Sequence, residues 1–413
     1  MKKFLIFVVV AMLSTVARGE VGDIFSYEKL DFRVLSEDEH TVEVYSYRDF
    51  IIGEFVIPSV VVNGTSSYDV IQIGKDAFYG SGGITSITIP NTVTQIGAGA
   101  FHLCNSLTSI TIPESVIEIG ELVFQECSSL TEIIVENGNP NYTSEDGVLF
   151  SIDKKELLTC PGGKTGVYTI PSSVTRIGEN AFYSCYSLTS VIIPSSVTEI
   201  GRAAFTGSTI TSIDIPNSVT EIGEYAFSNN YCLTSVTIPD SITVIEEYMF
   251  YYCHSLTSVT IPESVTKIGK CAFCSCLGLN SIIIPDSVIE IGEYAFMETP
   301  ITSIIIPDSV IKIGKSAFCH TLLTSVTIPQ SVTKIEPDTF AICRMLESVT
   351  IPESVIEIGE SAFFYCERLA SVTIPESVTK IGNGAFDDCT RLTSVTIPES
   401  VTKIGDYAFL LYP

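Results

Sequence analysis

Thirteen cysteines are the residues of this chain with the most evident chemistry. If the chain forms a stack of repeated β-strands, neighbouring strands lie about 4.8 Å apart, and cysteines at equivalent positions would be within the Cα range of a disulfide. Cysteine also packs well as a small apolar side chain, and an odd number cannot pair fully within one chain, so we predict a ladder of buried free thiols. Disulfides are the alternative if the chain is secreted. Eight of the cysteines lie three residues after a recurring phenylalanine: Cys104, Cys127, Cys185, Cys253, Cys276, Cys343, Cys366 and Cys389.

No grouping of residues in the sequence is typical of a catalytic or metal site. Cys271, Cys274 and Cys276 lie close together, but no cysteine or histidine pairs recur at zinc-finger spacing. The histidines at positions 40, 102, 254 and 320 occupy unrelated repeat positions, so no nucleophile has an evident base beside it. Glycines recur with the repeat and do not cluster as in a phosphate loop. We therefore predict a protein that is not an enzyme and uses no cofactor.

The charge of the chain argues against nucleic acid as a partner. Forty-eight acidic residues against 22 basic ones give a formal net charge of -26, which repels phosphate backbones. The acidic residues are spread along the chain, as expected for a solvated outer face. Calcium bridging between rows of carboxylates is the alternative.

The hydroxyl side chains are the remaining candidates for a binding site. They recur as a Ser-x-Thr pattern that a β-strand would place on one outward face. Threonine favours strands in any case, which accounts for the pattern without a function. The functional interpretation is an extended docking face, and a face for an ordered lattice such as ice is a further alternative. The candidate binding residues are Ser86, Thr88, Ser109, Thr111, Ser235, Thr237, Ser258, Thr260, Ser325, Thr327, Ser348, Thr350, Ser371, Thr373, Ser394 and Thr396.

An internal repeat must position these side chains. Its period is 22 or 23 residues, with a single interval of 58 residues between Phe124 and Phe182. A period of 20 to 29 residues with one short strand per unit is typical of a leucine-rich-repeat solenoid, in which stacked units share one core. Fourteen phenylalanines mark the units, at positions 78, 101, 124, 182, 205, 227, 250, 273, 296, 318, 340, 363, 386 and 409.

Each part of a unit has an expected place in the fold. In the unit that begins at Leu256, the side chains of Val259 and Ile261 are predicted to face the core, and Pro262 ends the strand because it has no N–H to donate. The glycine that follows a later isoleucine, as at Gly269, predicts a bend with positive φ.

The first residues are typical of a secretory signal. Lys2 and Lys3 precede an apolar run, and small residues at Ala17 and Gly19 suit cleavage, so residues 1–19 are predicted to be removed. The run is short for a membrane span, although an uncleaved anchor is the alternative. No later segment is predicted to cross a membrane.

The repeat resembles that of the BspA-type leucine-rich-repeat surface proteins, which reads Leu-Thr-Ser-Val-Thr-Ile-Pro-x-Ser-Val-Thr-x-Ile-Gly-x-x-Ala-Phe-x-x-Cys. The 58-residue interval is similar to an odd unit of that family, here marked by Asn139 to Tyr142. Within it, Val148 to Phe150 and Glu156 to Thr159 flank Asp153-Lys154 and predict a β-hairpin. We expect a β-rich N-terminal cap over residues 20–56 and a solenoid over residues 57–413, in which residues 131–170 form the hairpin-containing unit.

The resemblance implies a secreted or cell-surface protein that adheres to extracellular or host surface proteins, without an active site. No membrane insertion is expected. The alternative is a structural surface protein that self-associates through its C-terminal end. The last unit stops at Phe409 to Pro413 without a further strand, so either a partner covers that end or the chain continues beyond it.

Overall fold

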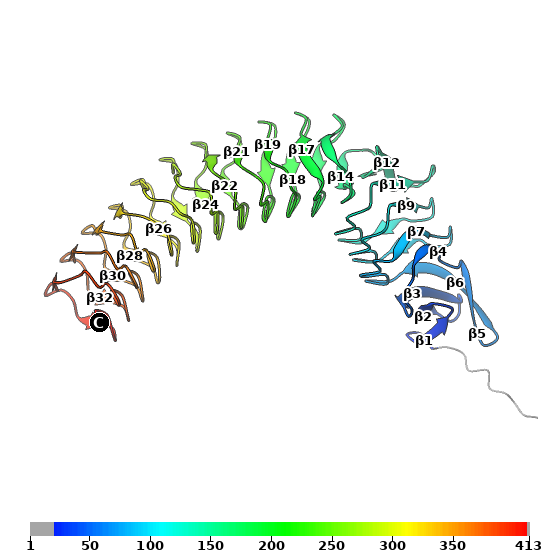
Figure 1. Cartoon of the computed structure of the whole chain (residues 1–413), viewed down its shortest axis with the longest axis horizontal. Helices are drawn as coiled ribbons and strands as arrows, with labels where there is room; N and C mark the ends of the chain where they lie inside the picture. Colours follow the sequence, from blue (N-terminus) through cyan, green and yellow to red (C-terminus); the bar gives the residue numbers. More distant parts are fainter. Residues whose placement is uncertain (1–19, 411–413) are drawn as a thin grey trace, which may run out of the picture.

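The chain forms a curved solenoid in the computed structural model, which describes residues 20–410. A β-rich region lies at one end of the arc and the last unit at the other (Figure 1). The predicted leucine-rich-repeat solenoid is therefore confirmed. The predicted signal peptide lies outside the described residues.

The predicted strand of each unit forms a first ladder of parallel strands. Equivalent residues pair between neighbouring units, as Val236 pairs with Val259, and the paired serines and threonines flank them. The valine of each pair points inward, while the hydroxyl side chains face solvent. This ladder consists of β7 (Ile84–Thr88), β9 (Ser109–Ile112), β11 (Glu132–Val135), β15 (Gly166–Thr169), β17 (Leu188–Ile192), β19 (Ser212–Asp214), β21 (Ser235–Thr237), β23 (Ser258–Thr260), β27 (Ser325–Thr327), β29 (Ser348–Thr350), β31 (Val372–Thr373) and β33 (Val395–Thr396).

A second ladder of two-residue strands runs along the array, and the sequence analysis did not anticipate it. In most of these strands an outward polar or charged residue precedes an inward isoleucine, as in Glu290 and Ile291. Two residues are too few to show the alternation by which strands are recognised. This ladder consists of β8 (Gln95–Ile96), β10 (Glu118–Ile119), β16 (Arg176–Ile177), β18 (Glu199–Ile200), β20 (Glu221–Ile222), β22 (Val244–Ile245), β24 (Lys267–Ile268), β25 (Glu290–Ile291), β26 (Lys312–Ile313), β28 (Lys334–Ile335), β30 (Glu357–Ile358), β32 (Lys380–Ile381) and β34 (Lys403–Ile404).

The third side of each unit is a turn that carries the marker phenylalanine, and it also bonds to the next unit. The N–H of Phe250, for example, donates to the carbonyl of Ala272 at 2.9 Å. Most stacked units are therefore joined by backbone hydrogen bonds on three sides, as buried backbone groups require. The ladders have breaks, as between β20 and β22 in the second ladder and between β23 and β27 in the first.

The prediction of a positive φ at the repeated glycine, as at Gly269, is wrong. Gly269 does not have a positive φ, whereas Cys271, two residues later, has a φ of 51°. A Cβ on Gly269 would lie 2.7 Å from the carbonyl oxygen of Ile245 in the preceding unit. The glycine therefore allows close stacking of neighbouring turns, and non-glycine residues such as Cys271 take the left-handed positions.

The marker phenylalanines form the centre of the core, as predicted. Their rings stack nearly parallel, for instance Phe273 on Phe250 with centroids 5.4 Å apart and planes at 10°. One stack runs from Phe78 to Phe124 and a second from Phe182 to Phe409. Offset parallel rings of this kind contribute favourable contacts beyond the apolar area that they bury.

The eight predicted cysteines are buried, and seven of their thiols each donate a hydrogen bond to the preceding unit, a series that we call the thiol relay. The Sγ of Cys276 donates to the carbonyl of Phe250 in the preceding unit at 3.1 Å, and six other rungs bond in the same way. All thirteen cysteines are free in the structure. Two shorter units have threonine instead, and Thr299 and Thr321 each donate to the phenylalanine carbonyl of their own unit. This position of the repeat thus carries a small side chain that donates a hydrogen bond to the carbonyl of a marker phenylalanine.

An N-terminal β-sheet continues directly into the array. β1 (Ile24–Tyr27), β2 (Leu30–Ser36) and β3 (Thr41–Tyr47) pair antiparallel, and β5 (Val60–Asn63) pairs with β6 (Ser66–Ile73). β3 and β8 flank β6 in parallel, so this sheet joins the second ladder. β4 (Gly53–Val56) pairs with β7 and starts the first ladder.

The predicted hairpin is confirmed and divides the array into two parts. β12 (Tyr142–Glu145), β13 (Val148–Ser151) and β14 (Glu156–Thr159) form an antiparallel meander, and β14 then pairs in parallel with β16. The second ladder stops at β10 and resumes at β14, and the first stops at β11 and resumes at β15. The buried side chains accordingly form two clusters, with the division at Val148 and Leu149.

Candidate functional site

The predicted hydroxyl pairs lie together on the first-ladder face, the outward surface of the first-ladder strands. Thirteen of the sixteen side chains are exposed, and Ser86, Ser109 and Thr111 are partly buried. Other hydroxyls of the repeat are used internally: Ser115 donates to the carbonyl of Val93 at 2.6 Å, and Thr108 to that of Thr85 at 3.2 Å. The sixteen candidates form no side-chain hydrogen bond to another group within residues 20–410, so they are available to a partner.

Two exposed isoleucines interrupt the hydroxyl rows. Ile283 and Ile305, in adjacent units, occupy the outward position that threonine has in most units, and each is 84% exposed, more than Ile134 and Ile192 at the same position. The structure assigns no first-ladder strand to these two units, between β23 and β27. Sequence reasoning missed this apolar pair, although its signal is present in the two Ser-Ile-Ile-Ile-Pro segments. Neighbouring apolar side chains in a polar rim are typical of the centre of protein-binding surfaces.

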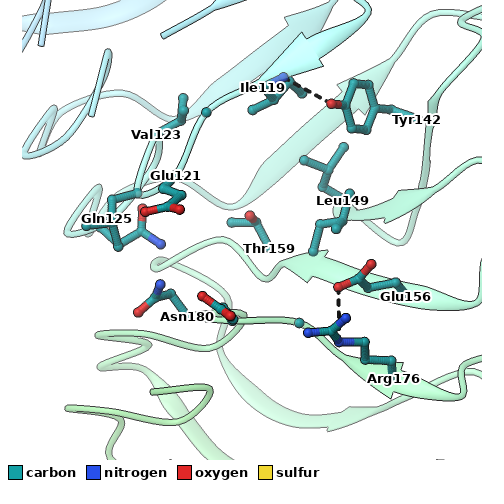
Figure 2. A pocket seen from close by; sticks show the side chains of 15 residues that line it. Ile119, Glu121, Val123, Gln125, Tyr142, Leu149, Glu156, Thr159, Arg176 and Asn180 are labelled. Atoms are coloured by element: carbon teal, nitrogen blue, oxygen red, sulfur yellow. Dashed lines mark hydrogen bonds and ion pairs between the residues drawn. The ribbon is translucent and has the colours of Figure 1, made fainter. Parts of the chain in front are cut away.

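A cavity of about 360 Å³ lies at the junction that the hairpin creates. It opens between the turn of residues 119–125 on one side and β14 and residues 176–180 on the other. Figure 2 shows Glu121, Gln125 and Asn180 at one end of this junction cavity, with Tyr142 and Leu149 at the other. The cavity exists because no second-ladder strand fills the space between β10 and β14.

Three side chains of the odd unit complete the hydrogen bonding of the interrupted rung. Asn139 donates its amide to the carbonyl of Val116 at 2.9 Å, and Asn141 donates to that of Ile117 at 2.6 Å. The Tyr142 hydroxyl accepts the N–H of Ile119 at 3.0 Å, a bond drawn in Figure 2. The Asn-x-Asn-Tyr motif therefore replaces the backbone partners that a regular unit would supply, as buried polar groups require.

The electrostatics of the junction cavity are dominated by carboxylates. The Arg176 guanidinium lies between two of them, with its Nε 3.5 Å from Glu156 and 3.2 Å from Glu199, so its charge is balanced. Glu121 and Glu179 also line the cavity, and no ion pair involves either of them within residues 20–410. Burial raises the pKa of Tyr142, and the nearby Glu118 carboxylate raises it further, while the Ile119 N–H lowers it.

The described residues contain no arrangement typical of a metal site. Within residues 20–410, no group of three or more histidine, cysteine or acidic side chains could hold a metal ion. The Cys276 thiol donates to the Phe250 carbonyl, whereas the Cys274 thiol lies 3.7 Å from the Ser275 hydroxyl. The imidazole Nε2 of His102 lies 3.9 Å from Glu126 in an adjoining turn. In the same part of the chain no helix is long and apolar enough to span a membrane.

Comparison with known proteins gives one family and several related structures. The profile of the BspA type Leucine rich repeat region, in six copies, matches residues 28–155, 164–280, 243–345 and 311–411. A leucine-rich repeat protein from Bacteroides ovatus is 30% identical with a TM-score of 0.56, over 94% of this chain and 91% of that chain.

Two further solved structures are similar at lower scores. A leucine rich cell surface protein from Faecalibacterium prausnitzii is 28% identical with a TM-score of 0.49, over 93% of this chain and 94% of that chain. A leucine-rich repeat protein from Eubacterium ventriosum is 21% identical with a TM-score of 0.40, over 91% of this chain and 96% of that chain. No curated protein matches the chain.

Proposed function

Because this chain belongs to the BspA-type leucine-rich-repeat family, we propose that it is a secreted or cell-surface protein that adheres to other proteins through its first-ladder face. The N-terminal sequence supports export, since Lys2 and Lys3 precede an apolar run and small residues at a cleavage position. The partners are extracellular or host surface proteins.

The observation that carries the proposal is the apolar pair Ile283 and Ile305 within rows of unused hydroxyls. Apolar side chains at the centre of an interface supply most of its affinity, while polar groups around them set orientation. A solenoid presents such groups at a constant spacing, which suits an extended partner surface. The role inferred for the chain is binding without catalysis.

A binding assay with paired variants tests this proposal. We expect the purified protein to bind to immobilised extracellular matrix proteins or to host cell surfaces, above an unrelated solenoid of similar negative charge. Replacement of both Ile283 and Ile305 by threonine, the residue of neighbouring units, should weaken binding at least about tenfold, because the apolar centre is lost.

The second ladder provides the matched control. Ile289 and Ile311 are also exposed isoleucines in these same two units, and threonine is again the residue of neighbouring units. Their replacement by threonine should leave binding unchanged. Equal losses from the two double variants, or no binding to any surface above the control solenoid, would contradict the proposal.

A second candidate function is self-association through the C-terminal unit. There Ile404 is exposed, although its equivalent Ile381 in the preceding unit is buried. Together with the exposed Tyr407, it forms an apolar edge of the kind that a second copy could cover. Sedimentation at increasing protein concentration tests this candidate, and a strict monomer at high concentration would exclude it.

A further inference from the structure

We propose that Cys271 and Cys274 form a redox-active thiol pair, which a peroxide such as hydrogen peroxide oxidises to a disulfide within one turn. The pair lies in the turn that carries the marker Phe273, and neither cysteine belongs to a first-ladder strand. The proposal is therefore independent of the function assigned to the first-ladder face, and either can fail without the other.

The first step of the argument is the turn that brings the two cysteines together. The N–H of Cys274 donates to the carbonyl of Cys271 at 3.2 Å. This bond closes a four-residue turn and holds the two Cα atoms within about 7 Å, close to the range in which a disulfide forms. The two thiols also hydrogen-bond to each other. Disulfide formation therefore requires movement only within this turn.

The second step is the difference in acidity between the two thiols. The hydrogen bond from the Cys274 thiol lowers the pKa of the Cys271 thiol, and burial opposes this shift. A hydrogen bond from the Tyr248 hydroxyl and the charge of Lys270 lower the same pKa further. The thiol–thiol hydrogen bond and burial both raise the pKa of Cys274. Because the thiolate is the form that attacks, Cys271 is the nucleophile and Cys274 stays protonated.

The third step is access from solvent. Cys271 is 7% exposed and Cys274 is 4% exposed, whereas Cys253 and Cys276 of the thiol relay are 0% exposed. Burial raises the pKa of both relay thiols, and each donates a hydrogen bond to a phenylalanine carbonyl. A small peroxide can reach a thiol at the rim of the solenoid, while enclosed neutral thiols are inert. The turn pair is therefore oxidised in preference to the relay.

The reaction has two steps and consumes one peroxide. The Cys271 thiolate attacks one oxygen of hydrogen peroxide, so that an S–O bond forms and the O–O bond breaks. The hydroxide that leaves takes up the proton that the Cys271 thiol had released. The Cys274 thiol then attacks the sulfur of this sulfenic acid, the S–S bond forms, and the hydroxyl group leaves with the thiol proton as water. The two cysteines lose two electrons, which reduce the peroxide to two molecules of water.

Mass spectrometry of the full chain tests the pair. The protein is reduced, freed of reductant, exposed to hydrogen peroxide, and alkylated with iodoacetamide in denaturant before digestion. We expect a disulfide between Cys271 and Cys274, while Cys276 in the same segment is alkylated. Absence of this disulfide, or faster pairing of the buried neighbours Cys104 and Cys127, would overturn the proposal.

Serine variants separate the roles of the two thiols. Serine is the residue at both positions in other units, as Ser316 and Ser228 show. Cys274→Ser should stop the reaction at a sulfenic acid on Cys271, which dimedone traps, and Cys271→Ser should leave Cys274 unmodified. Cys276→Thr, with the threonine of two shorter units, is the matched control and should be oxidised like the parent chain. A sulfenic acid on Cys274 in Cys271→Ser would overturn the assignment of the nucleophile.

Tyr248 is a positioning residue, and its effect should appear in the pH profile. Tyr248→Phe removes a donor to the Cys271 thiolate, so the pH at which oxidation is half-maximal should rise. The oxidation rate at neutral pH should fall about threefold or more, because less thiolate is present. Tyr294→Phe alters the equivalent tyrosine of the next unit and should leave the profile unchanged. No shift in Tyr248→Phe, or equal shifts in both variants, would overturn this role.

Discussion

The regular array from Phe182 to Phe409 and the junction around residues 119–180 are built from the same repeat but differ in how they satisfy their polar groups. In the regular array most units bond to the next on three sides, although each ladder has further breaks, and the phenylalanines stack on those of the units before and after. At the junction both ladders stop, and no phenylalanine stacks between Phe124 and Phe182.

The thiol relay shows the same contrast. Cys276 donates to a phenylalanine carbonyl at 3.1 Å, whereas Cys185, just after the junction, meets only the carbonyls of Cys160 and Pro161 at 3.7 and 3.9 Å. Repetition thus supplies most polar groups with partners from the neighbouring unit, although cavities also occur in the regular array, such as one of about 470 Å³ beside Arg202, Gly223 and Glu246. At the interruption the partners are instead special side chains of the odd unit.

The largest expected effect concerns the phenylalanine stack. Phe273→Ala in the regular array should reduce the free energy of unfolding by about 3–5 kcal/mol, because a fully enclosed ring is lost. Phe124→Ala should reduce it less, since Phe124 stacks on Phe101 only. Hydrogen exchange with mass spectrometry resolves the two buried clusters and measures both losses. An equal or greater loss of unfolding free energy in Phe124→Ala would contradict the expected difference between the two regions.

An intermediate effect is expected from alkaline pH. Burial raises the pKa of the Cys253 thiol from 9.0 to about 12. Above pH 9 the unfolded state releases this proton while the folded state keeps it, so stability falls as pH rises and is unaffected below pH 9. The loss should be about 1.4 kcal/mol per pH unit for this thiol, up to about pH 12.

The variant Cys253→Thr isolates that contribution in urea unfolding at pH 8 and pH 10. The variant should lose less stability than the parent chain between these two values. Replacement of the exposed Cys232 by threonine is the control and should leave the pH dependence of the parent unchanged. Parallel curves for all three proteins would show that the buried thiol does not govern alkaline stability.

The smallest effect should come from the junction itself. Tyr142→Phe removes the hydroxyl that accepts the Ile119 N–H, at a cost of about 1 kcal/mol. The exchange of the Ile119 amide hydrogen should accelerate, while that of Phe273 in the regular array stays the same. Unchanged exchange at Ile119 would indicate that the tyrosine is not needed to complete the rung. Tyr183→Phe, which alters a partly buried tyrosine next to the marker Phe182, is the control.

The period and its residues predicted the core and the hairpin, because their signals lie within single units. The place of Phe273 in the stack and the strands around Asp153 both follow from local pattern. The second ladder did not follow, since a pair such as Glu290 and Ile291 is too short to alternate. The glycine bend was misplaced because the contact that requires Gly269 is made with another unit.

The candidate sites differ in the same way. The hydroxyl rows could be predicted residue by residue, and their exposed positions agree with strand alternation. The junction cavity could not be predicted, because its lining residues, such as Gln125 and Asn180, come from both sides of the odd unit. The sequence does not show how closely that unit brings them together. Gln125 follows a marker phenylalanine at a position where the residue type varies widely between units, so it carries no signal of its own.

The direction of the thiol relay also bears on how such a gene can change in length. Seven cysteines donate to the unit before them, as Cys366 does to Phe340, so donor and acceptor belong to consecutive repeats. Duplication or loss of one whole 23-residue segment by unequal recombination would restore the same bond at the new seam. The solenoid can therefore become longer or shorter by one whole unit and keep this hydrogen bond between units. A change within the odd unit would instead remove the hydrogen bonds that its asparagine and tyrosine side chains make.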